Sequence, residues 1–184
     1  WEEIESGETE LVASKQALIR KVKVVSIDVR FMDDSTGSLK KFRLFETKQE
    51  FSDGRQRERN QWGVREKMKP GEEVLDAARR ALQEELGIEL SEDVAGRFIT
   101  VGQTIVVKES RSYSGLQSQF EIHQFVIHLN SEEFSHEGYV ERQEDKSTFF
   151  EWREQPPLRF ICFDIGGVLL HRDREASLSL ARKR

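Results

Sequence analysis

Alternating hydrophobic and polar residues near the start of the chain predict a β-hairpin. In one segment the hydrophobic positions fall on every second residue, namely Val25, Ile27, Val29 and Phe31. This period of two is typical of a strand with one buried face. The polar cluster at 33–38 predicts a turn, and residues 40–48 have the pattern of the returning strand.

A spacing of three and four residues predicts one helix in the middle of the chain. Its hydrophobic stripe consists of Leu75, Ala78, Leu82 and Leu86. Pro70 and Gly71 interrupt the preceding strand, and Gly87 suits the left-handed position that ends many helices. We therefore expect a helix from about residue 73 to residue 86.

The other segments favour strands over helices. Residues 8–20 have the pattern of a short amphipathic helix, with Leu11, Leu18 and Ile19 on its apolar side, and residues 51–60 that of a polar loop. Further strands are expected at 61–67, 98–108, 119–129 and 147–154. Many strands around one strong helix favour an α+β or α/β sandwich built on a mixed sheet.

Composition narrows the class of protein. The 184 residues suit one globular domain, and a net charge of -5, from 29 basic and 34 acidic residues, disfavours duplex nucleic acid as a partner. No apolar run reaches the roughly 18 residues of a membrane span. The single cysteine, Cys162, excludes an internal disulfide and allows an intracellular, cytoplasmic location. Because the chain starts at Trp1, a targeting segment for an organelle stays open.

The polar side of the predicted helix carries the candidate chemistry. Arg80 and Glu84 are one turn apart and can pair. Glu84 and Glu85 are adjacent carboxylates, which repel unless solvent screens them or they share a cation. Mg²⁺ prefers such oxygen ligands and binds phosphates as well. Composition alone is explained more simply by a charged surface helix than by a helix that binds a cation. The order of the residues decides between these two interpretations.

That order resembles the Nudix hydrolase signature, G-x5-E-x7-R-E-U-x-E-E-x-G-U, in which U is a bulky aliphatic residue. Seven positions match in register: Glu72, Arg80, Leu82, Glu84, Glu85, Gly87 and Ile88. The order of strands extends the resemblance over roughly residues 20 to 154. It implies the α/β fold class, as a Nudix-type α/β/α sandwich around a mixed β-sheet, with 21–154 as the domain and 1–20 as a helical extension.

The resemblance also implies roles for these residues. Nudix enzymes cleave a diphosphate linkage in a nucleoside diphosphate derivative by attack of a metal-activated water. Glu84 and Glu85 would then be ligands of Mg²⁺ or Mn²⁺, and Arg80 and Glu72 would orient the acidic cluster. Among partners, the resemblance implies a small nucleotide-like substrate and leaves the oligomeric state open, a homodimer included.

Two positions depart from the signature. Glu66 stands where the leading Gly is expected, which affects only the local backbone. Ala81 stands where a Glu is a metal ligand or general base in many members. General-base assistance is worth roughly 10²–10⁴ in rate, so this departure matters more. It leaves an alternative open: a catalytically inactive Nudix module that binds a nucleotide, RNA or protein partner.

Residues outside the helix offer substitutes for the missing carboxylate and contacts for phosphate. A loop acid often supplies the base in this family, and four candidates are Glu121, Glu137, Glu141 and Glu144. The sequence does not choose among them. The polar loop contains three arginines, at positions 55, 57 and 59. A solvated surface is the favoured interpretation of these arginines, and contact with a phosphate is the alternative.

The C-terminal part, residues 155–184, is expected to be an extension, as a truncation or a gene fusion would produce. Residues 158–170 resemble the first motif of haloacid dehalogenase-like phosphatases, with Asp164 at the position of the nucleophile and Gly166 at that of the second Asp. The later Lys and acidic motifs of that family are absent. We therefore favour a buried strand or hydrophobic tail over a working phosphatase.

Overall fold

The computed structural model describes residues 2–13, 18–35, 37–90, 96–110, 113–156, 161–163 and 169–171. The chain divides into two compact units, Trp1–Glu154 and Gln155–Arg184. The first unit contains the helices α1 (Glu2–Glu5) and α2 (Val74–Leu86). Its strands are β1 (Glu10–Ala13), β2 (Leu18–Asp33), β3 (Lys40–Phe51), β4 (Gln56–Trp62), β5 (Val64–Lys67), β6 (Ile99–Glu109), β7 (Gln117–Leu129), β8 (Tyr139–Arg142) and β9 (Lys146–Gln155).

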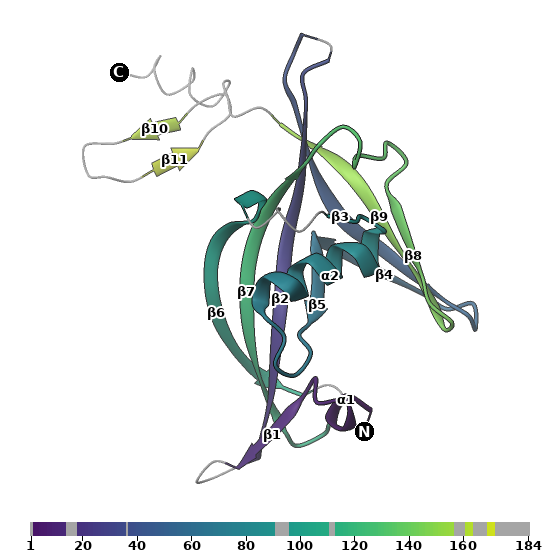
Figure 1. The fold of residues 1–184 in the computed structure, drawn as a ribbon, viewed down its shortest axis with the longest axis vertical. Coiled ribbons are helices and arrows are strands. Elements are labelled where there is room, and N and C mark those ends of the chain that lie inside the picture. The colour runs from purple at the N-terminus through teal and green to yellow at the C-terminus, as the bar shows by residue number, and fades with distance from the viewer. Residues whose placement is uncertain are drawn as a thin grey trace, which may run out of the picture. The chain divides into compact units, whose positions relative to one another are not determined.

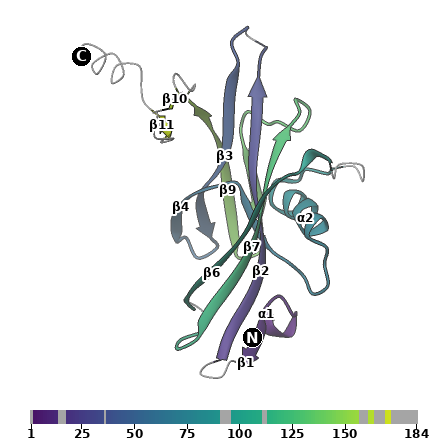
Figure 2. The same cartoon turned by 90° about the vertical axis from the view of Figure 1, so that its left-hand side faces the viewer.

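One mixed sheet dominates this unit. Its strand order is β6-β7-β2-β3-β9-β8, while β1 and β5 pair with β2, and β4 pairs with β3. The long strands β2 and β7 run parallel, and β2 is antiparallel to β3 and β5. Figure 1 shows α2 crossing in front of β2 and β5, and Figure 2 shows that it lies on one side of the sheet. The mixed α/β fold class is therefore confirmed.

The hydrophobic core lies between α2 and the sheet. The predicted stripe of α2 is partly or fully buried, and α2 buries Ala77 and Ala81 as well. The strand β2 contributes the alternating residues Val25, Ile27 and Val29 to the same core, and each of them is fully buried. Gly87 has a φ of 68° and donates its backbone N–H to Gln83 O, so the predicted end of the helix is confirmed. None of the helices in the described ranges combines the length and apolar character that crossing a bilayer requires.

Two expectations about local structure are wrong. Residues 10–13 form β1 and pair antiparallel with residues 18–21 of β2, so residues 8–20 are not a helix. The start of β2 also pairs with β7, and these long-range partners outweigh a weak helical pattern. The boundary expected between residues 20 and 21 thus falls inside β2. Likewise, the expected loop at 51–60 is a short turn followed by β4, which hydrogen-bonds to β3.

The second unit is described only over two short strands. β10 (Ile161–Phe163) and β11 (Leu169–His171) pair antiparallel, with Cys162 opposite Leu170. A strand at 161–163 fits the interpretation of this stretch as a strand. Asp164 and Gly166, on which the phosphatase resemblance depends, lie outside the described residues.

A glycine between β4 and β5 permits a close backbone contact that shapes this sheet. Gly63 has a φ of 66°, and a Cβ there would lie 1.9 Å from the carbonyl oxygen of Ile27 on β2. We expect Gly63→Ala to lower the free energy of unfolding by about 3 kcal/mol, through backbone strain and this clash. Urea denaturation would measure the loss.

Gly54→Ala is the matched control for this substitution. Gly54 also has a positive φ, of 84°, but its Cβ would meet nothing within 4 Å. It should therefore cost only about 1 kcal/mol. Equal losses for the two variants would show that the contact with Ile27 does not limit the residue at position 63.

Candidate active site

Arg80 connects β5, the turn after it and α2. Its Nε lies 2.8 Å from Glu72 Oε1, and its Nη2 lies 3.0 Å from Glu72 Oε2. Nη2 also donates to the carbonyl oxygen of Lys67, at 2.7 Å. The guanidinium lowers the pKa of Glu72, and the carboxylate in turn raises the pKa of Arg80. This ion pair fixes the turn before the helix relative to the helix itself.

Glu84 is held by cations on the outer side of α2. Its Oε2 lies 2.7 Å from Arg80 Nη1, and its Oε1 lies 3.7 Å from Lys69 Nζ. Its side chain is 49% exposed. Both of its oxygens thus face positive charge, so the two adjacent glutamates of the signature have different surroundings.

Glu85 faces other carboxylates instead. Burial and the carboxylates of Glu141 and Glu66 together raise the pKa of Glu85 to about 8, while Lys146 acts in the opposite direction. Such a shift favours the protonated form of Glu85 at neutral pH, and a cation beside the carboxyl group would favour the charged form. Carboxyl groups from three separate segments therefore converge on one place.

Glu141 is the loop acid that the structure brings to Glu85. It lies on β8, and its Oε1 accepts a hydrogen bond from Gln143. Its Oε2 is buried, and a hydrogen bond between the carboxyl groups of Glu141 and Glu85 contributes to the raised pKa of Glu85. A buried carboxylate oxygen is costly unless a proton, a donor or a cation lies beside it, and Glu85 supplies the proton in its protonated form.

The other three candidate acids lie elsewhere. Glu121 pairs with His123, its Oε1 lying 3.1 Å from the ring Nε2, and both line a separate cavity beside the N-terminal segment. Glu137 and Glu144 are exposed. Of the four, only Glu141 affects the pKa of Glu85.

Glu66 is a site residue that the sequence interpretation missed. The signature treats this position only as a departure from glycine, which affects the local backbone. In the structure its carboxylate lies 3.7 Å from Arg80 Nη1, and burial raises its pKa. The alternation of β5 could have indicated this position. Val64 and Glu66 lie on the same face of the strand, and Val64 is a core residue, so Glu66 is expected to face inward as well.

Ala81 is part of the hydrophobic core. It has no exposed surface and belongs to the same cluster as Ala77, Ala78 and Leu82. Position 81 lies one helical turn before Glu85, and therefore on the same side of α2. The small side chain lets α2 pack closely against the sheet.

The carboxylates suit a divalent cation by their chemistry. Glu66, Glu85 and Glu141 offer hard oxygen ligands, and a divalent cation could take the place of the proton that Glu85 and Glu141 share. Within the described ranges, no three Asp, Glu, His or Cys side chains already stand in the arrangement of a metal site. A cation would therefore draw these three side chains together rather than enter a preformed cage.

A cavity of about 480 Å³ opens beside these carboxylates. Glu66 and Glu85 line it together with Phe120 of β7. Its basic residues include Arg59, Lys108 and Lys146. The lining thus combines acids, cations and an aromatic ring, which are the kinds of group that bind a phosphate ester carrying a planar group.

Comparison with known proteins gives structural similarity only. No family model and no curated protein matches the sequence. Among solved structures, a MutT/nudix family protein from Enterococcus faecalis is similar, with a TM-score of 0.49 and 12% identity over 92% of this chain. The chain spans 54% of that protein.

Two structures of an Ap4A hydrolase from C. elegans are also similar, each at 12% identity. The binary complex has a TM-score of 0.36. The match covers 72% of this chain and 77% of the hydrolase chain. The other structure has a TM-score of 0.33. The match covers 69% of this chain and 78% of the hydrolase chain.

Proposed function

We propose that this chain is a Nudix-type hydrolase that cleaves a diphosphate linkage in a nucleoside diphosphate derivative, with Mg²⁺ or Mn²⁺ as its cofactor. The observation that carries the proposal is the convergence of Glu66, Glu85 and Glu141 at the end of the signature helix, where burial and the neighbouring carboxylates raise the pKa of Glu85 to about 8. Carboxylates in that state are a donor set for a hard divalent cation.

Within this proposal, Glu66 supplies the carboxylate that Ala81 lacks. The two departures from the signature then compensate, because one carboxylate is lost from the helix and another is gained on the neighbouring strand β5. Arg80 and Glu72 position the turn and keep Glu84 on the outer side. When bound, the metal would neutralise diphosphate charge and make a water molecule more acidic.

The alternative is an inactive Nudix module that binds a nucleotide, RNA or protein partner. One observation favours it: both oxygens of Glu84 face Arg80 and Lys69. A Glu84 held in this way contributes to the site only if one of these ion pairs opens.

A hydrolysis screen separates the two. Purified protein with Mg²⁺ should release phosphorylated products from at least one nucleoside diphosphate derivative. Glu66→Gln should reduce that rate about 100-fold, because it removes a carboxylate from the set that binds the cation. Chromatography of the products would measure both rates.

Glu89→Gln is the control, since Glu89 is an exposed acid just beyond α2. It should leave the rate unchanged. Absence of turnover across the whole panel, with folded protein and Mn²⁺ also tested, would contradict the hydrolase and favour the binding module.

A further inference from the structure

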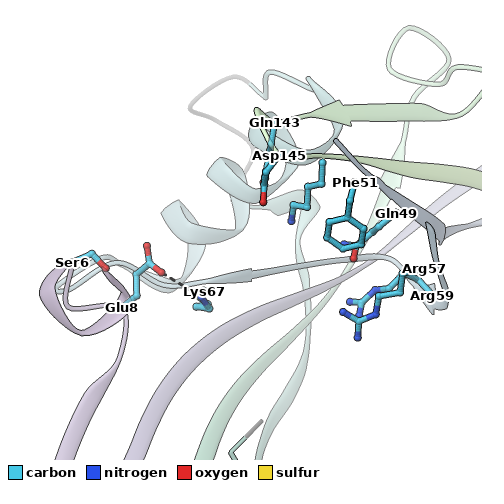
Figure 3. A pocket seen from close by; sticks show the side chains of 10 residues that line it. Ser6, Glu8, Gln49, Phe51, Arg57, Arg59, Lys67, Gln143 and Asp145 are labelled. Atoms are coloured by element: carbon cyan, nitrogen blue, oxygen red, sulfur yellow. Dashed lines mark hydrogen bonds and ion pairs between the residues drawn. The ribbon is translucent and has the colours of Figure 1, made fainter. Parts of the chain in front are cut away.

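A second cavity, of about 980 Å³, adjoins the one beside Glu85. The two have four lining residues in common, Gln49, Arg59, Lys67 and Lys146. Figure 3 shows this second cavity, with Arg57 and Arg59 together on one wall and Gln143 and Asp145 on another. A ligand held at Glu85 can therefore extend into this space.

Cations outnumber acids in this second cavity. Arg57, Arg59, Lys67 and Lys146 line it, against Glu8 and Asp145. Lys67 Nζ lies 3.5 Å from Glu8 Oε2, and Arg59 Nε lies 2.8 Å from Glu46 Oε1. Within the described part of the chain Arg57 forms no salt bridge, so its charge is left for a ligand, whereas Lys146 already acts on the carboxyl group of Glu85.

The pattern of β4 explains why two arginines face the cavity and a third does not. Arg57 and Arg59 are two residues apart on a strand, so their side chains emerge on the same face. Arg55 precedes the strand, and its Nε binds Asp53 Oδ2 at 2.7 Å. The three arginines, indistinguishable in the sequence, thus have separate surroundings.

We infer that this second cavity is an anion subsite that holds an additional phosphate group of the substrate. The inference rests on the proposed function, which places the scissile diphosphate beside Glu85. The favoured substrates are then nucleotide derivatives with at least one phosphate beyond that diphosphate, rather than those ending in a neutral sugar. Arg57, a guanidinium without a salt bridge among the described residues, is suited to bind such a phosphate, and the other three cations add positive charge around it.

The test is equilibrium binding of two inorganic probes to the full chain, at fixed ionic strength and in EDTA. Inorganic triphosphate should bind about tenfold more tightly than inorganic diphosphate, because only triphosphate reaches both cavities. Arg57→Gln should weaken triphosphate binding about fivefold and leave diphosphate binding unchanged. Isothermal titration calorimetry gives both constants.

Arg55→Gln is the matched control, because it removes the same charge two residues away, outside the cavity. It should leave both probes unaffected. Equal affinity for the two probes, or equal losses in the two variants, would overturn the subsite. The readout needs no turnover, so an inactive protein that keeps this preference contradicts the hydrolase alone. A hydrolase without the preference contradicts the subsite alone.

Discussion

Replacing Glu85 with Gln will make the folded protein more stable at alkaline pH and will abolish most of the hydrolysis that we propose for it. The pKa of Glu85 is about 8 in the folded chain, against an ordinary value of 4.5. Folding therefore takes up a proton between about pH 4.5 and about pH 8, and stability falls as the pH rises through that window. Gln resembles the protonated acid. Above pH 8 the free energy of unfolding of the variant should therefore exceed that of the wild type by about 2 kcal/mol.

Thermal and urea unfolding at pH 5 and at pH 8.5 would measure this gain. In the wild type, Mg²⁺ should raise the midpoint at pH 8.5, because it replaces the missing positive charge. In Glu85→Gln that increase should shrink, and the hydrolysis rate should fall about 100-fold or more. Glu66 leaves a smaller pH dependence of the same sign, because burial raises its pKa too.

Glu89→Gln serves again as the exposed control and should follow the wild type at both pH values. A wild type whose stability is the same at pH 5 and pH 8.5 would show that Glu85 is not buried among carboxylates. A stabilised Glu85→Gln variant with full activity would remove Glu85 from the catalytic site but leave its surroundings as described.

Local patterns predicted the parts of the fold that depend on neighbouring residues. The hairpin of β2 and β3 and the helix α2 follow from periods of two and of three to four, together with turn residues at their ends. Residues 8–20 and 51–60 were misassigned because their hydrogen-bond partners lie in other strands. The polarity of one segment carries no information about such partners.

The candidate site divides in the same way. The register of the signature brought attention to Arg80 and Glu72, eight residues apart, and their side chains are in contact. The pairing of Glu85 with Glu141 joins α2 to β8, more than 50 residues along the chain, and depends on where β8 lies. Glu66 was missed for another reason, since its position was judged by the signature rather than by the face of its strand.

Ala81→Glu, which restores the signature, is expected to be strongly destabilising in the absence of a divalent cation. Ala81 is 0% exposed and packs in the core between α2 and the sheet. A carboxylate there would be buried one turn from Glu85, on the side where Glu66 and Glu141 already act on that residue. The free energy of unfolding in EDTA should fall by about 3–5 kcal/mol, as for other buried charges without a partner.

Two companion variants separate the causes of that loss. Ala81→Gln has the same size without the charge, so it measures overpacking alone, about 1–3 kcal/mol. Adding Glu66→Gln to Ala81→Glu should recover stability, because one of the neighbouring acids is removed. Mg²⁺ should recover it in Ala81→Glu and not in Ala81→Gln, as urea denaturation in each buffer would measure.

The outcome decides what Ala81 means for the site. If Ala81→Glu and Ala81→Gln are equally stable in EDTA, position 81 admits a carboxylate without a cation, and Glu66 has nothing to replace. If Mg²⁺ rescues only Ala81→Glu, the cation reaches the carboxylates around Glu85. In that case the alanine is retained because α2 packs against the sheet at position 81, and the third acid comes from β5.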